Sequence, residues 1–122
     1  MDKKEKKAFI LLKAVILYYH GLDDDERLIL EETAQNHDAH SELSWALEFI
    51  REDYITAFDR ARDYLNESMA TLDRSSKISY LMDVWKDNYR KGYITEMEAT
   101  AMLNLASDWQ IQREVMTSIR NI

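Results

Sequence analysis

The sequence predicts an all-α fold, a compact helical bundle of about six to seven helices, and three observations carry this prediction. The 122 residues contain no proline and only two glycines, Gly21 and Gly92, whereas sandwiches and barrels need many turns built from both residue types. Apolar residues recur at helical spacing along most of the chain. Hydrophobic residues make up 46% of the chain, too many for a disordered protein. This length fits a single domain, residues 1–122.

The first predicted helix runs from Lys4 to His20 and ends at Gly21, which accepts a left-handed backbone at little cost. Residues 8–19 are almost wholly apolar, so we expect this helix in the middle of the bundle. The apolar run is shorter than the roughly 20 residues that a membrane span requires. The sequence therefore predicts no membrane span, while a preceding lysine cluster leaves peripheral association open: Lys3, Lys4, Lys6 and Lys7.

The second predicted helix starts at Asp23, which caps the free N–H groups. Glu26 lies three residues further on, as in a capping box. The polar segment 36–40 is typical of a loop, with Asp38 or Ser41 as the next cap.

Segment 41–66 has two apolar stripes at helical spacing, separated by the charged residues 51–53. The pattern leaves open whether this segment is one long helix or two helices with a bend near Asp53. The expected inward-facing residues are Leu43, Ala46, Leu47, Ile50, Tyr54, Phe58, Ala61 and Leu65.

A further helix is expected to begin between residues 73 and 76 and to end at Gly92. Thr95 and Glu98 then form a second capping box and open the next helix. Residues 111–119 form a weaker amphipathic helix. The expected inward face of the helix before Gly92 carries Ile78, Leu81, Met82, Trp85 and Tyr89.

Aligning Gly21 with Gly92 produces an internal two-fold repeat of helix–Gly–helix units. Each unit is an apolar helix stopped by a glycine, followed by a capped second helix, and two such pairs can bury their apolar faces together. The matched positions are Ile10 with Leu81, Leu11 with Met82, Tyr18 with Tyr89, Asp23 with Thr95, Glu26 with Glu98, Leu30 with Met102, and Ala34 with Ala106.

The two units resemble the tellurite-resistance TerB-like family. The similarity is best in residues 78–111, ISYLMDVWKDNYRKGYITEMEATAMLNLASDWQI, and residues 8–34 resemble the family's first unit. The resemblance implies an all-helical fold with an internal repeat and a role in stress response or tellurite resistance. The family typically has Asp immediately before each glycine, whereas this chain has His20 and Lys91 there.

Composition excludes several classes of function. The net charge of −7 disfavours nucleic acid as a partner, because such binding needs clustered Lys and Arg. The chain has no cysteine, no glycine-rich phosphate loop and no serine in a nucleophile-elbow motif, which indicates a non-enzymatic protein. The lack of disulfides favours a cytoplasmic location.

The leading functional hypothesis is a helical interaction protein that binds a protein partner without a cofactor. Tyr93 follows Gly92 in an expected turn and is predicted to project outward, so we place partner binding there and at the acidic turn with its neighbours Tyr19 and His20.

The alternative hypothesis is a divalent-cation-binding module. Carboxylates in one turn offer the hard oxygen ligands that such cations prefer. A second possible site is a pair of histidines three residues apart, which suits zinc or nickel. The candidate ligands are Asp23, Asp24, Asp25 and Glu26 in the turn, and His37 and His40 in the pair.

Overall fold

Helix α1 (Lys3–Leu17) is the central element of the fold, which is described by a computed structural model for residues 1–18, 23–90 and 92–121. Every residue from Ala8 to Leu17 is buried, so the prediction of a central first helix is confirmed. The predicted end of this helix at His20 is wrong, because the helix ends at Leu17 and Tyr18 is its C-cap. Gly21 lies outside the described residues.

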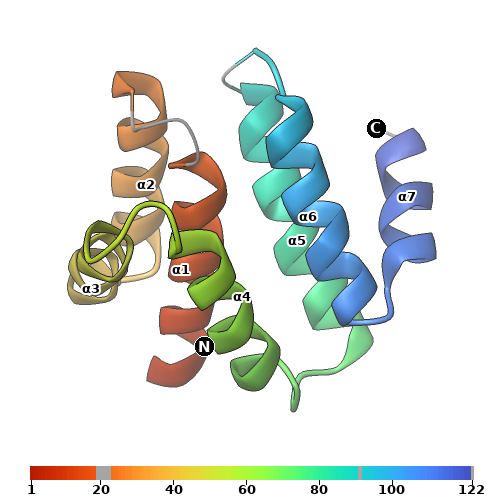
Figure 1. The fold of residues 1–122 in the computed structure, drawn as a ribbon, viewed down its shortest axis with the longest axis horizontal. Coiled ribbons are helices and arrows are strands. Elements are labelled where there is room, and N and C mark those ends of the chain that lie inside the picture. The colour runs from red at the N-terminus through yellow and green to blue at the C-terminus, as the bar shows by residue number, and fades with distance from the viewer. Residues whose placement is uncertain (19–22, 91, 122) are drawn as a thin grey trace.

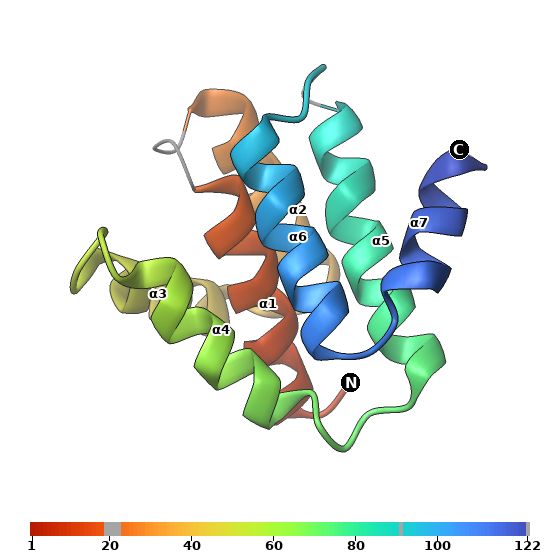
Figure 2. The ribbon, with the colours of Figure 1, turned by 45° about the vertical axis from the view of Figure 1, so that its right-hand side comes forward.

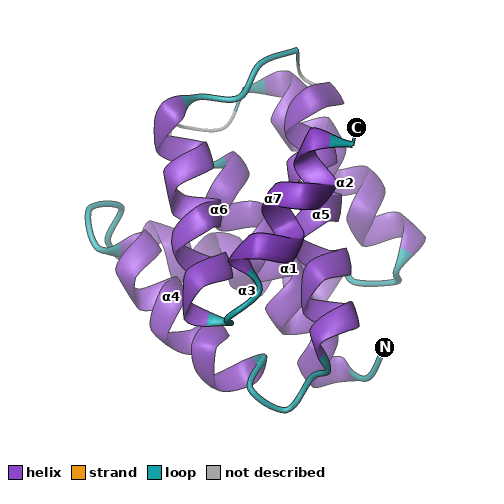
Figure 3. Cartoon of the chain, turned by 90° about the vertical axis from the view of Figure 1, so that its right-hand side faces the viewer, coloured by secondary structure: helices purple, strands orange, loops and turns teal. Residues whose placement is uncertain are grey.

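Six further helices complete the described part of the chain, and no strand occurs in it, so the all-α prediction is confirmed (Figures 1 and 3). Helix α1 packs against α2, α3, α4, α5 and α6, and α7 packs against α5 and α6 (Figure 2). The six helices are α2 (Asp24–Asn36), α3 (His40–Arg51), α4 (Ala57–Ser68), α5 (Arg74–Arg90), α6 (Glu96–Asp108) and α7 (Gln112–Arg120).

The start of α2 follows the predicted capping box. The Asp23 side chain accepts a hydrogen bond from the Glu26 N–H at 2.8 Å, and the Asp23 N–H donates to Glu26 Oε1 at 3.3 Å. The predicted cap of α3 is wrong, because the N-cap is Ala39 and no side chain caps it. Asp38 instead ends α2 with a positive φ of 51°, which Asp tolerates, and Ser41 lies inside α3.

The segment 41–66 forms two helices, which settles the alternative that the sequence leaves open. The Asp53 side chain accepts a hydrogen bond from the Ile55 N–H at 3.0 Å, and this local turn competes with continuation of α3. As a result Tyr54 lies between the helices and is 57% exposed, so its predicted inward orientation is wrong. Ala61 and Leu65 are fully buried as expected.

Helices α5 and α6 begin where the sequence predicts. The Thr95 hydroxyl accepts from the Glu98 N–H and the Thr95 N–H donates to Glu98 Oε1, both at 3.1 Å, which confirms the second capping box. Along α5 the sequence misplaces one aromatic residue, because Tyr89 is exposed. It also misses the burial of Asp87 and Asn88.

Helices α2 and α6 share several local features. Each has 13 residues and opens with a capping box. Each ends in a residue with positive φ, Asp38 at 51° and Gln110 at 59°. The next N–H donates back to the helix in both cases, from Ala39 to Ala34 O and from Ile111 to Ala106 O. The two-fold repeat as a whole stays a prediction, because Gly21 lies outside the described residues.

Gly92 has a φ of +97°, a backbone conformation that residues with a side chain rarely adopt. No atom lies within 4 Å of a Cβ added there, so only the backbone opposes a side chain. Replacing Gly92 with alanine is therefore expected to lower the free energy of unfolding by about 1 kcal/mol, as measured by urea denaturation. The G92N variant should lose less, because Asn tolerates positive φ better. A G92A variant as stable as the parent would contradict this account.

Candidate functional site

Two of the four carboxylates in the predicted acidic turn cap the N-terminus of α2. Asp23 and Glu26 bond to each other's backbone N–H groups, and Glu26 is buried. Asp24 and Asp25 are exposed in the first turn of α2, where carboxylates suit the positive end of the helix dipole. Among the described residues, no group of three or more His, Cys, Asp or Glu side chains is placed to hold a metal ion. Cation binding here stays a prediction.

The two predicted histidine ligands line different surface depressions. The His37 ring packs edge-on against Phe9, with 5.4 Å between ring centroids. His40 is exposed at the start of α3, in a depression that also contains Lys3 and Lys6. A metal site that uses both histidines stays a prediction.

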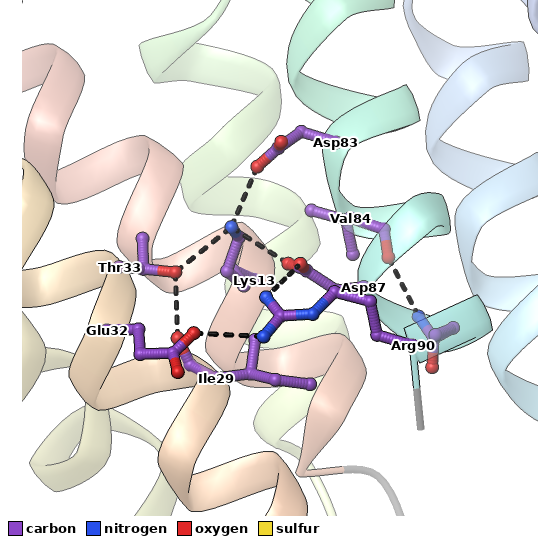
Figure 4. Close-up of polar contacts among 9 residues, drawn as sticks. Lys13, Ile29, Glu32, Thr33, Asp83, Val84, Asp87 and Arg90 are labelled. Carbon is purple, nitrogen blue, oxygen red and sulfur yellow. Dashed lines mark hydrogen bonds and ion pairs between the residues drawn. The ribbon is translucent and has the colours of Figure 1, made fainter. Parts of the chain in front are cut away.

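A buried lysine that the sequence analysis did not single out lies at the centre of a polar network between α1, α2 and α5 (Figure 4). Lys13 Nζ lies 2.7 Å from Asp83 Oδ2, 2.8 Å from Asp87 Oδ2 and 3.2 Å from Thr33 Oγ1. It also lies 4.8 Å from the centre of the Phe9 ring. The lysine side chain is 4% exposed, so this charge is held almost entirely by protein groups.

Asp87 is the buried anion of this network. Its side chain is 8% exposed, whereas that of Asp83 is 50% exposed. Burial raises the pKa of Asp87, and the neighbouring Lys13 opposes this rise. Arg90 lies 3.8 Å from Asp87 Oδ1 and donates to Glu32 Oε2 at 2.9 Å, which joins α5 to α2 (Figure 4).

The geometry makes this network a structural contact. Lys13 Nζ donates hydrogen bonds to Asp83 Oδ2 and Thr33 Oγ1 and forms an ion pair with Asp87 Oδ2. These contacts and the 4% exposure of its side chain direct Lys13 toward protein groups and away from any substrate in solvent. The network fixes the position of α5 against α1 and α2.

A groove opens between the C-terminal end of α1, the N-terminal ends of α4 and α6, and the turn between α3 and α4. We call it the apolar groove; its volume is about 650 Å³. Its floor is buried, whereas Ile55 on its rim is 93% exposed. The apolar groove is lined by Val15, Tyr18, Ile50, Tyr54, Ile55, Ala57, Phe58 and Met97.

Arg60 holds the turn that carries the rim of the apolar groove. Its guanidinium donates to Phe49 O at 2.9 Å and to Asp53 O at 2.8 Å, and its Nε donates to Thr56 Oγ1 at 2.9 Å. The guanidinium also lies 4.9 Å from the centre of the Phe49 ring. Arg60 therefore bonds the turn to both flanking helices. These hydrogen bonds fix the conformation in which Ile55 is exposed to solvent.

A second depression continues the apolar groove along α4 and α6, because both are lined by Phe58 and Met97. We call it the acidic extension. Its other lining residues are Asp59, Arg62, Glu96, Thr100, Ala101 and Asn104.

The sequence-predicted partner surface overlaps little with this groove. Tyr93 is exposed as predicted, but it is not among the lining residues of the apolar groove. Tyr19 and His20 lie outside the described residues. Sequence reasoning missed Ile55 because its exposure depends on where α3 ends; the Asp53 turn signal beside it was the available indication.

No protein-family model, curated protein or solved structure matches this chain. Within the described residues, no helix has the length and apolar character needed to cross a membrane.

Proposed function

We propose that this chain is a non-enzymatic interaction module that docks a segment of a partner protein in the apolar groove. The observation that carries the proposal is Ile55, an aliphatic side chain that is 93% exposed in a turn fixed by Arg60. Exposed aliphatic side chains beside an apolar depression are typical of binding surfaces. The TerB-like resemblance suggests a setting in cytoplasmic stress response or tellurite resistance.

The shape of the surface favours a peptide segment over a small molecule. A small molecule on the buried floor, beside Val15 and Ile50, would leave Ile55 in water. A chain segment can cover the floor and the rim together, and so remove more apolar area from solvent. Tyr18 and Tyr54 stack with 5.7 Å between ring centroids and supply a rigid aromatic edge for such contact.

Replacing Ile55 with aspartate is expected to weaken peptide binding at least about tenfold, because it removes an apolar anchor and puts a charged group against the apolar side chains of the peptide. The probe is a set of peptides selected from a displayed random library against the whole chain, with dissociation constants measured by fluorescence anisotropy. The I55D variant should keep the parent's stability, since the side chain is almost fully exposed.

The matched control is L28D, which changes another exposed aliphatic side chain that does not line the apolar groove. Selected peptides should bind L28D as tightly as the parent. Peptides that bind I55D with unchanged affinity would overturn the proposed docking surface.

A further inference from the structure

Negative charges outnumber positive charges around the acidic extension. Arg62 is its one cationic lining residue among those described, and Asp108 holds it through two hydrogen bonds at 2.6 and 2.8 Å. Asp59 and Glu96 line the same depression. Neither carboxylate forms an ion pair with any residue in the described ranges. Two negative charges therefore face this end of the groove without a cation of their own.

The surroundings of Arg62 show the same imbalance. The pKa of Arg62 is raised first by its hydrogen bonds with Asp108, and the charges of Asp108, Asp59 and Asp63 add to the rise. One guanidinium thus lies among three carboxylates. Arg60, the next arginine on α4, is already bonded to the backbone of the turn and to Glu52.

Resting on the proposed function, we infer that the docked segment is a basic amphipathic helix of a partner protein. Its apolar side chains cover Ile55 and the floor of the apolar groove, and its Lys or Arg side chains face Asp59 and Glu96. Complementary charge of this kind sets the orientation of a docked segment and rejects acidic competitors. The negative charge of an anionic membrane surface would be repelled by Asp59 and Glu96.

The test uses two synthetic helical peptides of about 16 residues with identical apolar residues at positions i, i+3, i+4 and i+7. One carries Lys on both sides of the apolar stripe and the other carries Glu. Anisotropy titrations of the whole chain are expected to give about tenfold tighter binding of the Lys peptide at low salt. The preference should shrink as salt screens the exposed charges.

The variant D59N/E96Q should lose most of the preference for the Lys peptide. The matched control E31Q/E67Q removes the same net charge at exposed positions that do not line either depression, and should keep the preference. Loss of binding in the I55D variant checks that both peptides use the groove.

The outcomes separate the inference from the proposed function. Equal binding of both peptides, abolished by I55D, would overturn the charge inference and leave docking in the groove intact. Preference for the Glu peptide, or for vesicles containing phosphatidylserine, would also overturn the charge inference. Binding that is indifferent to I55D, or no binding of either peptide, would count against the proposed function itself.

Discussion

Replacing Lys13 with methionine is expected to lower the free energy of unfolding by about 3–5 kcal/mol, the cost of leaving a buried charge without its partner. Methionine keeps the unbranched apolar part of the side chain, so packing in α1 changes little. The loss arises at Asp87, which is 8% exposed, and much less at Asp83, which water can reach. Urea denaturation of K13M and the parent measures the difference.

Two further variants identify the cause. K13M/D87N removes the buried negative charge as well, and should recover a large part of the lost stability, since a buried ion pair is costly mainly when one partner is removed. K4M deletes an exposed lysine of the same helix and should change stability by less than about 0.5 kcal/mol. If the free energy of unfolding of K13M lies within about 1 kcal/mol of the parent's, other groups must compensate the buried charge of Asp87.

The capping of α2 and α6 could be predicted because it depends on residues three apart. Asp23 with Glu26 and Thr95 with Glu98 each supply both hydrogen bonds of a capping box within one helical turn. No distant residue is needed to specify such a contact. The all-α fold was predictable for the same reason, since helical spacing is a local pattern.

The Lys13 network could not be predicted, because its members are distant in sequence. Lys13 is the only charged residue in the buried run 8–17, and that isolation signals a need for a counter-charge. The sequence does not say which carboxylates supply it. Asp83 and Asp87 lie on α5, which the fold brings beside α1, and their i, i+4 spacing places both on one helical face.

The apolar groove was missed because spacing alone does not give the end of a helix. Tyr54 and Phe58 continue the apolar stripe of the preceding helix, so the sequence predicts that both face inward. The Asp53 turn ends that continuity, and Arg60 then fixes the turn through carbonyl groups of two segments. The exposure of Ile55 therefore depends on tertiary contacts, which the spacing of apolar residues does not predict.

Replacing Asp108 with alanine is expected to lower the free energy of unfolding by about 2 kcal/mol. Asp108 accepts two hydrogen bonds from Arg62 and one from Asn66 Nδ2 at 3.0 Å, which joins α4 to the end of α6. Asn66 Oδ1 in turn accepts from Trp109 Nε1 at 2.9 Å. Hydrogen bonds to a charged group stabilise a fold by about 1.5–3 kcal/mol. We expect a value in the lower part of this range, because Arg62 is 35% exposed and partly screened by solvent.

The effect of Asp108 should depend on pH with a defined sign. Its hydrogen bonds with Arg62 hold the pKa of Asp108 below its ordinary value in the folded state. The carboxylate therefore contributes stability above the unfolded pKa, about 4, and this contribution is lost as the pH falls through the folded pKa. The stability difference between the parent and D108A should be largest near pH 6 and shrink toward pH 3, in urea denaturation series at about these values.

A matched variant separates the hydrogen bonds from charge alone. Asp63 also attracts Arg62 but forms no hydrogen bond with it, so D63A should change stability by less than about 0.5 kcal/mol. Equal losses in D63A and D108A, or a D108A loss that does not diminish in acid, would mean that the Arg62–Asp108 contact is not what joins α4 to α6. The predicted pattern would instead show that this contact joins α4 to α6 and engages Arg62, the only described cation that lines the acidic extension with Asp59 and Glu96.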